Sequence, residues 1–173
     1  TDLLHRARQV GLPVFEGYGL SECCSVVALN TPSSDRAGSV GRSLPHVDVR
    51  LAGDEIVVTG SVFLGYVDQP DSWGITDIHT GDLGYQDDDG FIYINGRVKN
   101  QLISSYGRNL SPEWVESELL SGGVLQQVVV IGDARPWCGA LVWPQDPATS
   151  DDEINAWIRR VNKRLPDYAR IVE

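Results

Sequence analysis

The segment GRVKNQLISSYGRNLSPEWVESEL, residues 96–119, lies where the character of the chain changes. Its first half predicts a strand and a turn at Gly107. Ser111 then predicts the cap of a helix that has Pro112 at its first position and Glu113 directly behind it, an arrangement that suits the free N–H groups of a helix start. The segment therefore predicts the first strand and first helix of a new folding unit.

The distribution of charge changes at the same place. The chain has 173 residues and a net charge of −10; residues 1–96 carry 5 basic and 14 acidic side chains, whereas residues 97–173 carry 9 and 10. We therefore expect two units, 1–98 and 99–173. Because non-specific binding of nucleic acids requires many cations, the acidic balance argues against a nucleic acid as partner.

Composition narrows the protein class further. A hydrophobic content of 42% and a charged content of 22% are typical of a globular protein. No apolar run approaches the roughly 18 to 20 residues that cross a bilayer, so we expect a cytoplasmic protein. Cys23, Cys24 and Cys138 form no CxxC motif, which predicts reduced, mostly buried thiols and no zinc site. A chain that begins with Thr1 and contains no methionine indicates a piece of a longer protein.

The first unit is expected to be mostly β. Residues 46–60 (HVDVRLAGDEIVVTG) alternate apolar and polar side chains and predict an antiparallel hairpin. Residues 78–97 predict a second hairpin with its tip at 88–90, and residues 63–70 predict a short strand and turn. Residues 40–96 therefore predict a small barrel or sandwich.

The second unit is expected to mix strands and helices. After the helix that Ser111 caps, residues 124–133 and 138–144 predict two strands, and residues 150–166 predict a helix with an acidic first turn and basic last turns. This β-α-β-β-α order predicts a small split α+β domain. The chain as a whole is therefore assigned to the α+β class.

The stretch EGYGLSECC, residues 16–24, places two glycines around a tyrosine. Residues 12–15 predict a strand before it, and Ser21 and Glu22 predict the cap and first turn of a helix over residues 23–30. A strand, a glycine loop and a helix start together favour an anion such as phosphate. The alternative interpretation is an ordinary strand-to-helix turn.

Asp82 is a candidate for recognising a sugar. It lies in HTGDLGY (79–85) at the start of a predicted strand, where a carboxylate is suited to accept hydrogen bonds from the vicinal hydroxyls of a ribose. The alternative is a simple aspartate turn. Arg97 and Lys99, at the boundary between the units, belong either to a site or to the solvated cations common at protein surfaces.

In this order and spacing, these segments closely resemble the C-terminal third of the adenylate-forming superfamily, which includes acyl-CoA synthetases, adenylation domains of peptide synthetases and firefly luciferase. The resemblance extends from about Val14 to the end of the chain. It implies the end of a large N-terminal domain with a distorted barrel, then a hinge, then a small mobile C-terminal domain, here truncated. It also implies two half-reactions, in which a carboxylate and ATP–Mg²⁺ give acyl-AMP and a thiol then accepts the acyl group.

The resemblance assigns roles around the nucleotide. Tyr18 matches the aromatic residue that stacks on adenine, and the backbone of Glu16 and Gly17 lines the edge of the ring. Ser21 stands where the family usually has a threonine that contacts the α-phosphate, and Glu22 matches the acid that holds Mg²⁺. A hard oxygen ligand of this kind suits magnesium.

Further roles follow from the later segments. Asp82 and Arg97 match the two residues that contact the ribose hydroxyls, Lys99 falls at the hinge, and Gly107 lies in the turn beside the channel for the pantetheine of coenzyme A. The family's phosphate loop and its C-terminal catalytic lysine have no match in residues 1–173. The resemblance therefore implies that this chain by itself adenylates nothing.

The expected parent protein is an AMP-forming acid–thiol ligase of the fatty-acid type, with ATP, a carboxylic acid and coenzyme A as partners. One alternative is an adenylation domain that loads a carrier protein. A second is a non-catalytic nucleotide-binding module, and a third is a β-rich interaction domain in which the motifs occur by chance.

Overall fold

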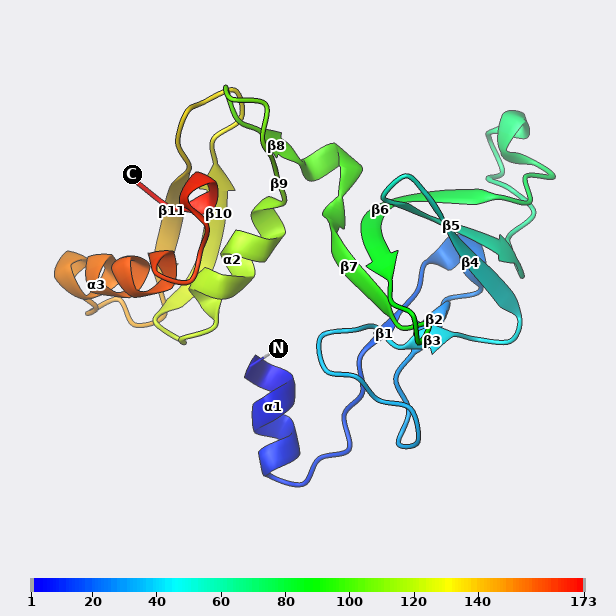
Figure 1. Cartoon of the computed structure of the whole chain (residues 1–173), viewed down its shortest axis with the longest axis horizontal. Helices are drawn as coiled ribbons and strands as arrows, with labels where there is room; N and C mark the ends of the chain where they lie inside the picture. The colour runs from blue at the N-terminus through cyan, green and yellow to red at the C-terminus, as the bar shows by residue number, and fades with distance from the viewer. Residues whose placement is uncertain (1, 173) are drawn as a thin grey trace. The chain divides into compact units, whose positions relative to one another are not determined.

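The computed structural model describes residues 2–172, and the chain divides into two compact units, Thr1–Val98 and Lys99–Glu173. Both units combine helices and strands, as Figure 1 shows, and the predicted α+β class is confirmed. Each unit has its own cluster of buried apolar side chains.

A four-stranded antiparallel sheet forms the centre of the first unit (Figure 1). Its strands, in spatial order, are β4 (Val47–Ala52), β5 (Glu55–Gly60), β6 (Ile78–Gln86) and β7 (Ile92–Arg97). Both hairpins predicted from the alternating pattern are therefore confirmed. Ile56, Val58 and Ile92 point into the core, where they are fully or almost fully buried.

A second, smaller sheet completes the first unit. It contains β1 (Gly17–Tyr18), β2 (Ala28–Leu29) and β3 (Arg42–Ser43), in that order. The helix α1 (Asp2–Gln9) precedes it, and three residues of 3-10 helix, η2 (Pro70–Ser72), follow β5. Because the sheet runs from β4 to β7 without pairing these two strands, the described part of the chain forms no closed barrel, and the predicted barrel is corrected to two open sheets.

Three local predictions for the first unit are wrong. Residues 12–15 and 63–70 contain no strand. The helix expected over residues 23–30 is absent: a single 3-10 turn, η1 (Ser21–Cys23), is followed by β2. The β-branched residues before β2 suit a strand, and pairing with β1 decided the conformation, so tertiary contacts outweighed the local helix signal.

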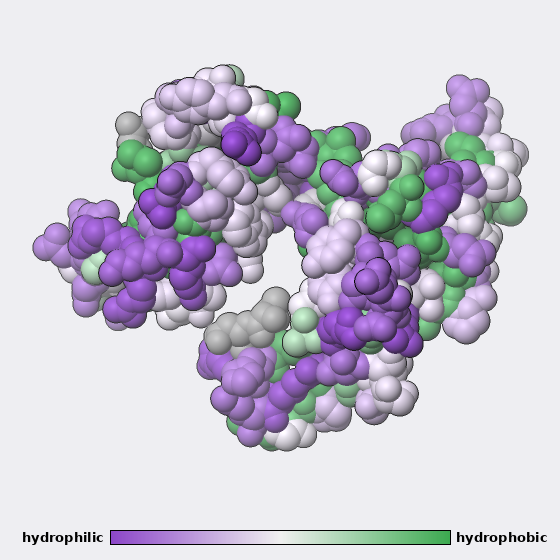
Figure 2. Space-filling model, in the orientation of Figure 1, coloured by the Kyte–Doolittle hydropathy of each residue, from purple (hydrophilic) through white to green (hydrophobic). Residues whose placement is uncertain are grey.

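The second unit follows the predicted order. Its elements are η3 (Val98–Asn100), which reaches across the boundary, β8 (Leu102–Ile103), β9 (Asn109–Leu110), α2 (Pro112–Leu120), β10 (Leu125–Ile131), β11 (Gly139–Pro144), α3 (Asp151–Asn162) and η4 (Asp167–Ala169). Ser150 and Glu153 form a reciprocal capping box at the start of α3. Figure 2 shows hydrophilic side chains over the outward surface of α3, while Val161 on its inner face is buried.

Two other expectations have an outcome in the structure. The cysteines are free, as predicted, but Cys24 is exposed while Cys23 and Cys138 are buried. Within residues 2–172, none of the helices combines the length and the apolar character that crossing a bilayer demands.

Candidate functional site

Three predicted site residues meet in the first unit. The Tyr18 hydroxyl donates a hydrogen bond to Oδ2 of Asp82 at 2.6 Å, and Nε of Arg97 contacts Oδ1 of the same carboxylate at 2.8 Å. Tyr18 comes from β1, whereas Asp82 and Arg97 face each other across the β6–β7 ladder. Residues 64 positions apart in sequence are thus brought into direct contact.

The electrostatics of this cluster suit a buried anion. Asp82 is only 5% exposed, and burying a carboxylate is costly unless hydrogen bonds and an opposite charge compensate. Burial, followed by the hydrogen bond to Asp82, raises the pKa of Tyr18 well above its ordinary value, so the phenol stays a donor. An ionised carboxylate has about four lone-pair positions, which leaves capacity for further donors.

The side chain of Arg97 is the accessible member of the cluster. It is 62% exposed, in contrast to the buried side chain of its partner Asp82. A ligand that approaches the carboxylate therefore meets the guanidinium at the surface. Arg97 is suited to contact the same ligand group as Asp82, because its guanidinium carries further N–H donors besides the Nε–H that contacts Asp82.

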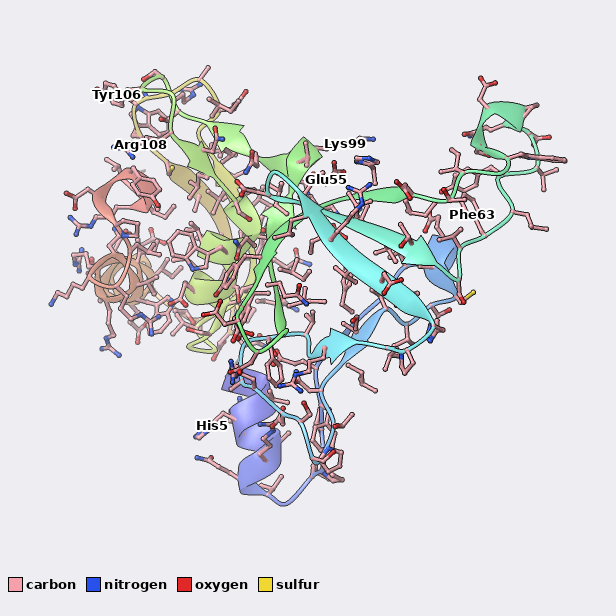
Figure 3. All side chains as sticks on the ribbon, turned by 45° about the vertical axis from the view of Figure 1, so that its right-hand side comes forward. His5, Glu55, Phe63, Lys99, Tyr106 and Arg108 are labelled. Carbon is pink, nitrogen blue, oxygen red and sulfur yellow. The ribbon has the colours of Figure 1, made fainter. Side chains whose placement is uncertain are left out.

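Glu22 lies in the same unit, on η1. The hydroxyl of Tyr66 donates to its carboxylate, and this hydrogen bond holds the pKa of Glu22 below its ordinary value, with the charge of Arg97 acting in the same direction. The backbone oxygen of Glu22 accepts from the N–H of Phe63 at 2.8 Å, and the Phe63 and Tyr66 rings pack edge to face at 4.8 Å. Figure 3 labels Phe63 on this segment.

Tyr66 was not predicted as a site residue from the sequence. It lies in the segment read only as a strand and turn, and it reaches Glu22 over 44 residues of chain. Asn30 and Ser39 were also missed, although both are fully or almost fully buried and joined by a hydrogen bond of 2.7 Å from Nδ2 of Asn30 to the Ser39 carbonyl. No local pattern distinguishes these polar residues from surface ones.

The glycines of EGYG serve the protein backbone. A Cβ on Gly19 would lie 1.6 Å from the carbonyl oxygen of Ser25, and one on Gly17 would lie 2.8 Å from Cδ1 of Leu29. The carbonyl of Glu16 accepts from the N–H of Asn30 at 2.9 Å. These glycines therefore allow a close approach between segments of the chain.

Ser21 is exposed, in the first position of η1. The cap position of this short helix is Leu20, so the predicted N-cap role of Ser21 is wrong. A helix of three residues has too few aligned peptides for a sizeable dipole, and the predicted contribution of a helix dipole to phosphate binding is wrong as well. The assignment of Ser21 to the α-phosphate stays a prediction.

Lys99 and Gly107 belong to the second unit. Lys99 lies in η3, at the first position after the boundary, and Gly107 lies in the turn between β8 and β9 with a φ of +72°. Figure 3 labels Lys99 and the neighbours of Gly107, Tyr106 and Arg108. The assignments of Lys99 to a hinge and of Gly107 to a coenzyme A channel stay predictions.

Few side chains of the described residues are placed to bind a metal ion. The described residues contain no group of three or more His, Cys, Asp or Glu side chains placed to hold an ion. A metal held by Glu22 would therefore have at most one further side chain of these types among the described residues. Mg²⁺ commonly binds through one or two carboxylates together with substrate phosphates. The donor set fits a magnesium ion that arrives with a nucleotide.

Comparison with known proteins places these residues in a family. Residues 99–173 match the family model of the AMP-binding enzyme C-terminal domain. The long-chain-fatty-acid–CoA ligase FadD15 of Mycobacterium bovis is 39% identical over 92% of this chain and 27% of its own length. The long-chain-fatty-acid–CoA ligase of Salmonella typhimurium is 33% identical over 87% of this chain and 30% of its own length.

The folded structure agrees with this match. The O-succinylbenzoate coenzyme A synthetase MenE of Bacillus subtilis, in complex with ATP and a magnesium ion, superposes with a TM-score of 0.81 at 28% identity, over 98% of this chain and 39% of the synthetase. The chain belongs to the adenylate-forming, AMP-binding enzyme superfamily. Within this superfamily it spans less than a third of the length of the two ligases named above.

Proposed function

We propose that this adenylate-forming family member carries the adenosine-binding part of an ATP-dependent ligase that converts a carboxylate to acyl-AMP and then to an acyl-CoA thioester. The observation that carries the proposal is the contact of Asp82 with both Tyr18 and Arg97. A buried carboxylate beside an exposed guanidinium is suited to a ligand that offers vicinal hydroxyl groups.

The roles of the site residues follow from this arrangement. Asp82 accepts hydrogen bonds from the ribose hydroxyls and Arg97 donates to the same sugar. Tyr18, whose hydroxyl is tied to Asp82, presents its ring to adenine, and the backbone of Glu16 and Gly17 lies along the edge of the base. Because the hydrogen bond to Asp82 fixes the Tyr18 side chain before the ligand binds, the entropic cost of binding is lower.

Glu22 and Ser21 are assigned to the phosphates of the nucleotide. Glu22 ligates the Mg²⁺ that accompanies ATP, and Ser21 donates to the α-phosphate. In the second unit, Lys99 acts as the hinge and Gly107 borders the path of coenzyme A. The match to the B. subtilis synthetase with ATP and magnesium supports the nucleotide and the metal.

We assign a fatty acid as the carboxylate. The support is that the two curated ligases described above, at 39% and 33% identity, act on long-chain fatty acids according to their names. A cytoplasmic location stays a prediction from the sequence.

The test measures AMP binding to the 173-residue chain by isothermal titration calorimetry. Asp82→Ala is expected to weaken binding by about tenfold or more, because a hydrogen bond to a charged acceptor contributes about 1.5–3 kcal/mol. Asp77→Ala is the matched control, since Asp77 forms an exposed ion pair with Arg50 at 2.8 Å and has no part in the site. Equal AMP affinity of the wild type and the Asp82 variant contradicts the ribose assignment.

A further inference from the structure

The strand that carries Asp82 is interrupted by a bulge. In the β5–β6 ladder, Val57 pairs with His79 and Glu55 pairs with Leu83. Residues 80–82 of β6 therefore lie opposite Ile56 alone. Bulges of this kind bend a strand and re-aim side chains, and they are frequent beside active sites. Here the re-aimed side chain is the carboxylate that Tyr18 and Arg97 contact.

A bulge leaves backbone N–H groups without ladder partners, and two side chains accept them here. Oε1 of Glu55 accepts from the N–H of Gly81 at 3.0 Å, and Oγ1 of Thr80 accepts from the N–H of Asp82 at 3.0 Å. The Thr80 hydroxyl in turn donates to the carbonyl of Ile56 at 2.7 Å. These bonds attach both sides of the bulge to the neighbouring strand β5.

The conformation of the bulge needs this support. Gly81 has a φ of +71°, in the left-handed region that glycine adopts readily. A free glycine at this point would sample many conformations, and each would place the next residue, Asp82, differently. The bond from Gly81 to Glu55 removes this freedom, because it joins the backbone to a carboxylate on an adjacent strand.

Glu55 is itself held in place. Its second oxygen, Oε2, is 2.8 Å from Nδ1 of His79, and this hydrogen bond lowers the pKa of Glu55 below its ordinary value. At neutral pH the acceptor of the Gly81 N–H is therefore an anion, and charge-assisted hydrogen bonds are stronger than neutral ones. Figure 3 shows Glu55 labelled on the sheet of the first unit.

We propose that Glu55 and Thr80 are positioning residues, which fix the bulge at Gly81 so that the Asp82 carboxylate is oriented toward the vicinal diol of a ribose. This inference rests on the proposed function, because it assumes that Asp82 receives the diol. It assigns to two residues outside the nucleotide contacts a share in recognising the sugar.

The experiment compares two nucleotides by calorimetry on the 173-residue chain. AMP offers both ribose hydroxyls, and 2′,3′-dideoxy-AMP offers neither. The ratio of their dissociation constants measures recognition of the diol and cancels effects on the base and the phosphate. For the wild type we expect AMP to bind about tenfold tighter or more, as for a hydrogen bond to a charged group.

Glu55→Ala and Thr80→Val are each expected to reduce this ratio at least about threefold, by weakening AMP and leaving dideoxy-AMP unchanged. Thr80→Ser keeps the hydroxyl and is expected to retain the ratio of the wild type. Thr59→Val is the matched control, because Thr59 lies on the same strand β5 but pairs with Asp48 of β4. Circular dichroism and thermal unfolding identify any variant that fails to fold, and Thr80→Val tests the bulge independently of Glu55→Ala.

The outcomes separate this inference from the proposed function. If Asp82→Ala leaves the ratio unchanged, the ribose assignment itself is wrong. If Asp82→Ala removes the discrimination while Glu55→Ala and Thr80→Val preserve it, the positioning role is wrong and the proposed function stands. A proportional loss of affinity for both nucleotides in the two variants shows a general structural effect and likewise overturns the positioning role.

Discussion

At the scale of single residues, the hydrogen bond between Tyr66 and Glu22 acts on the carboxylate that we propose as the magnesium ligand. The hydroxyl of Tyr66 donates to Glu22, which lowers the pKa of that carboxyl group and raises the pKa of the phenol. A metal ligand must be deprotonated, so a pKa below the ordinary value favours magnesium binding at neutral pH.

We expect Tyr66→Phe to raise the pKa of Glu22 toward its ordinary value of 4.5. The measurement is a pH titration of the Glu22 carboxyl carbon by NMR, with Tyr106→Phe as control because Tyr106 is exposed in the other unit.

The hydrogen bond from Tyr66 to Glu22 also contributes to the stability of the folded state. Because the pKa is lowered in the folded state, this contribution is present above pH 4.5 and is lost as the pH falls below it. The difference in Tm between the wild type and Tyr66→Phe should therefore shrink on acidification, and a constant difference contradicts the linkage.

At the scale of elements, the turn from Gly19 to Ser25 determines where Glu22 lies. Cys24 and Ser25 have φ values of +56° and +73°, a conformation that costs about 1–2 kcal/mol in residues other than glycine. The turn brings the Ser25 carbonyl against Gly19, where a side chain has no space. The strained conformation persists because β1 and β2 pair on either side of it.

Gly19→Ala is expected to destabilise the first unit by more than ~3 kcal/mol, since backbone atoms have to move to admit the methyl group. Gly74→Ala is the matched control: Gly74 also lies in the first unit, has a φ of +73°, and would place its Cβ at least 4 Å from its neighbours. Gly74→Ala should lower the free energy of unfolding by only about 1–2 kcal/mol, because the methyl group meets no neighbour and only the left-handed backbone conformation is unfavourable. Urea unfolding measures both, and equal losses would refute the steric explanation.

At the scale of the whole molecule, two separate cores stabilise the chain. The core of the first unit contains Ile56, Val58 and Ile92, and that of the second contains Val115 and Leu119. The two clusters share no residue. A defect in one core is therefore expected to act first on its own unit.

Leu119→Ala is expected to cost about 2–5 kcal/mol, as for other large-to-small changes at buried positions. Leu119 is fully buried on α2, whereas the adjacent Leu120 is 37% exposed, so Leu120→Ala is a matched control with a smaller effect. Hydrogen exchange should show faster exchange of the amides of β10, which packs against α2, and unchanged protection in β5. Loss of protection in β5 of equal size would show that the two units unfold together.

The sequence by itself determined the elements whose signals are local. The alternating pattern identified the β4–β5 hairpin. Ser111 and Pro112 identified the start of α2, although the Ser111 side chain makes no capping hydrogen bond, and the acidic first turn identified the start of α3. Side-chain periodicity and capping depend on residues two to four positions apart, so they can be read along the chain. The motifs around Tyr18, Asp82 and Arg97 identified the candidate site through their resemblance to a family.

Only the tertiary structure decided how these pieces meet. It replaced the expected helix after Ser21 by a turn and a strand, opened the expected barrel into two sheets, and joined Tyr66 to Glu22. It also placed the bulge that directs Asp82. These features depend on pairing and packing between segments up to 64 residues apart, and such contacts leave no periodic trace in the local sequence.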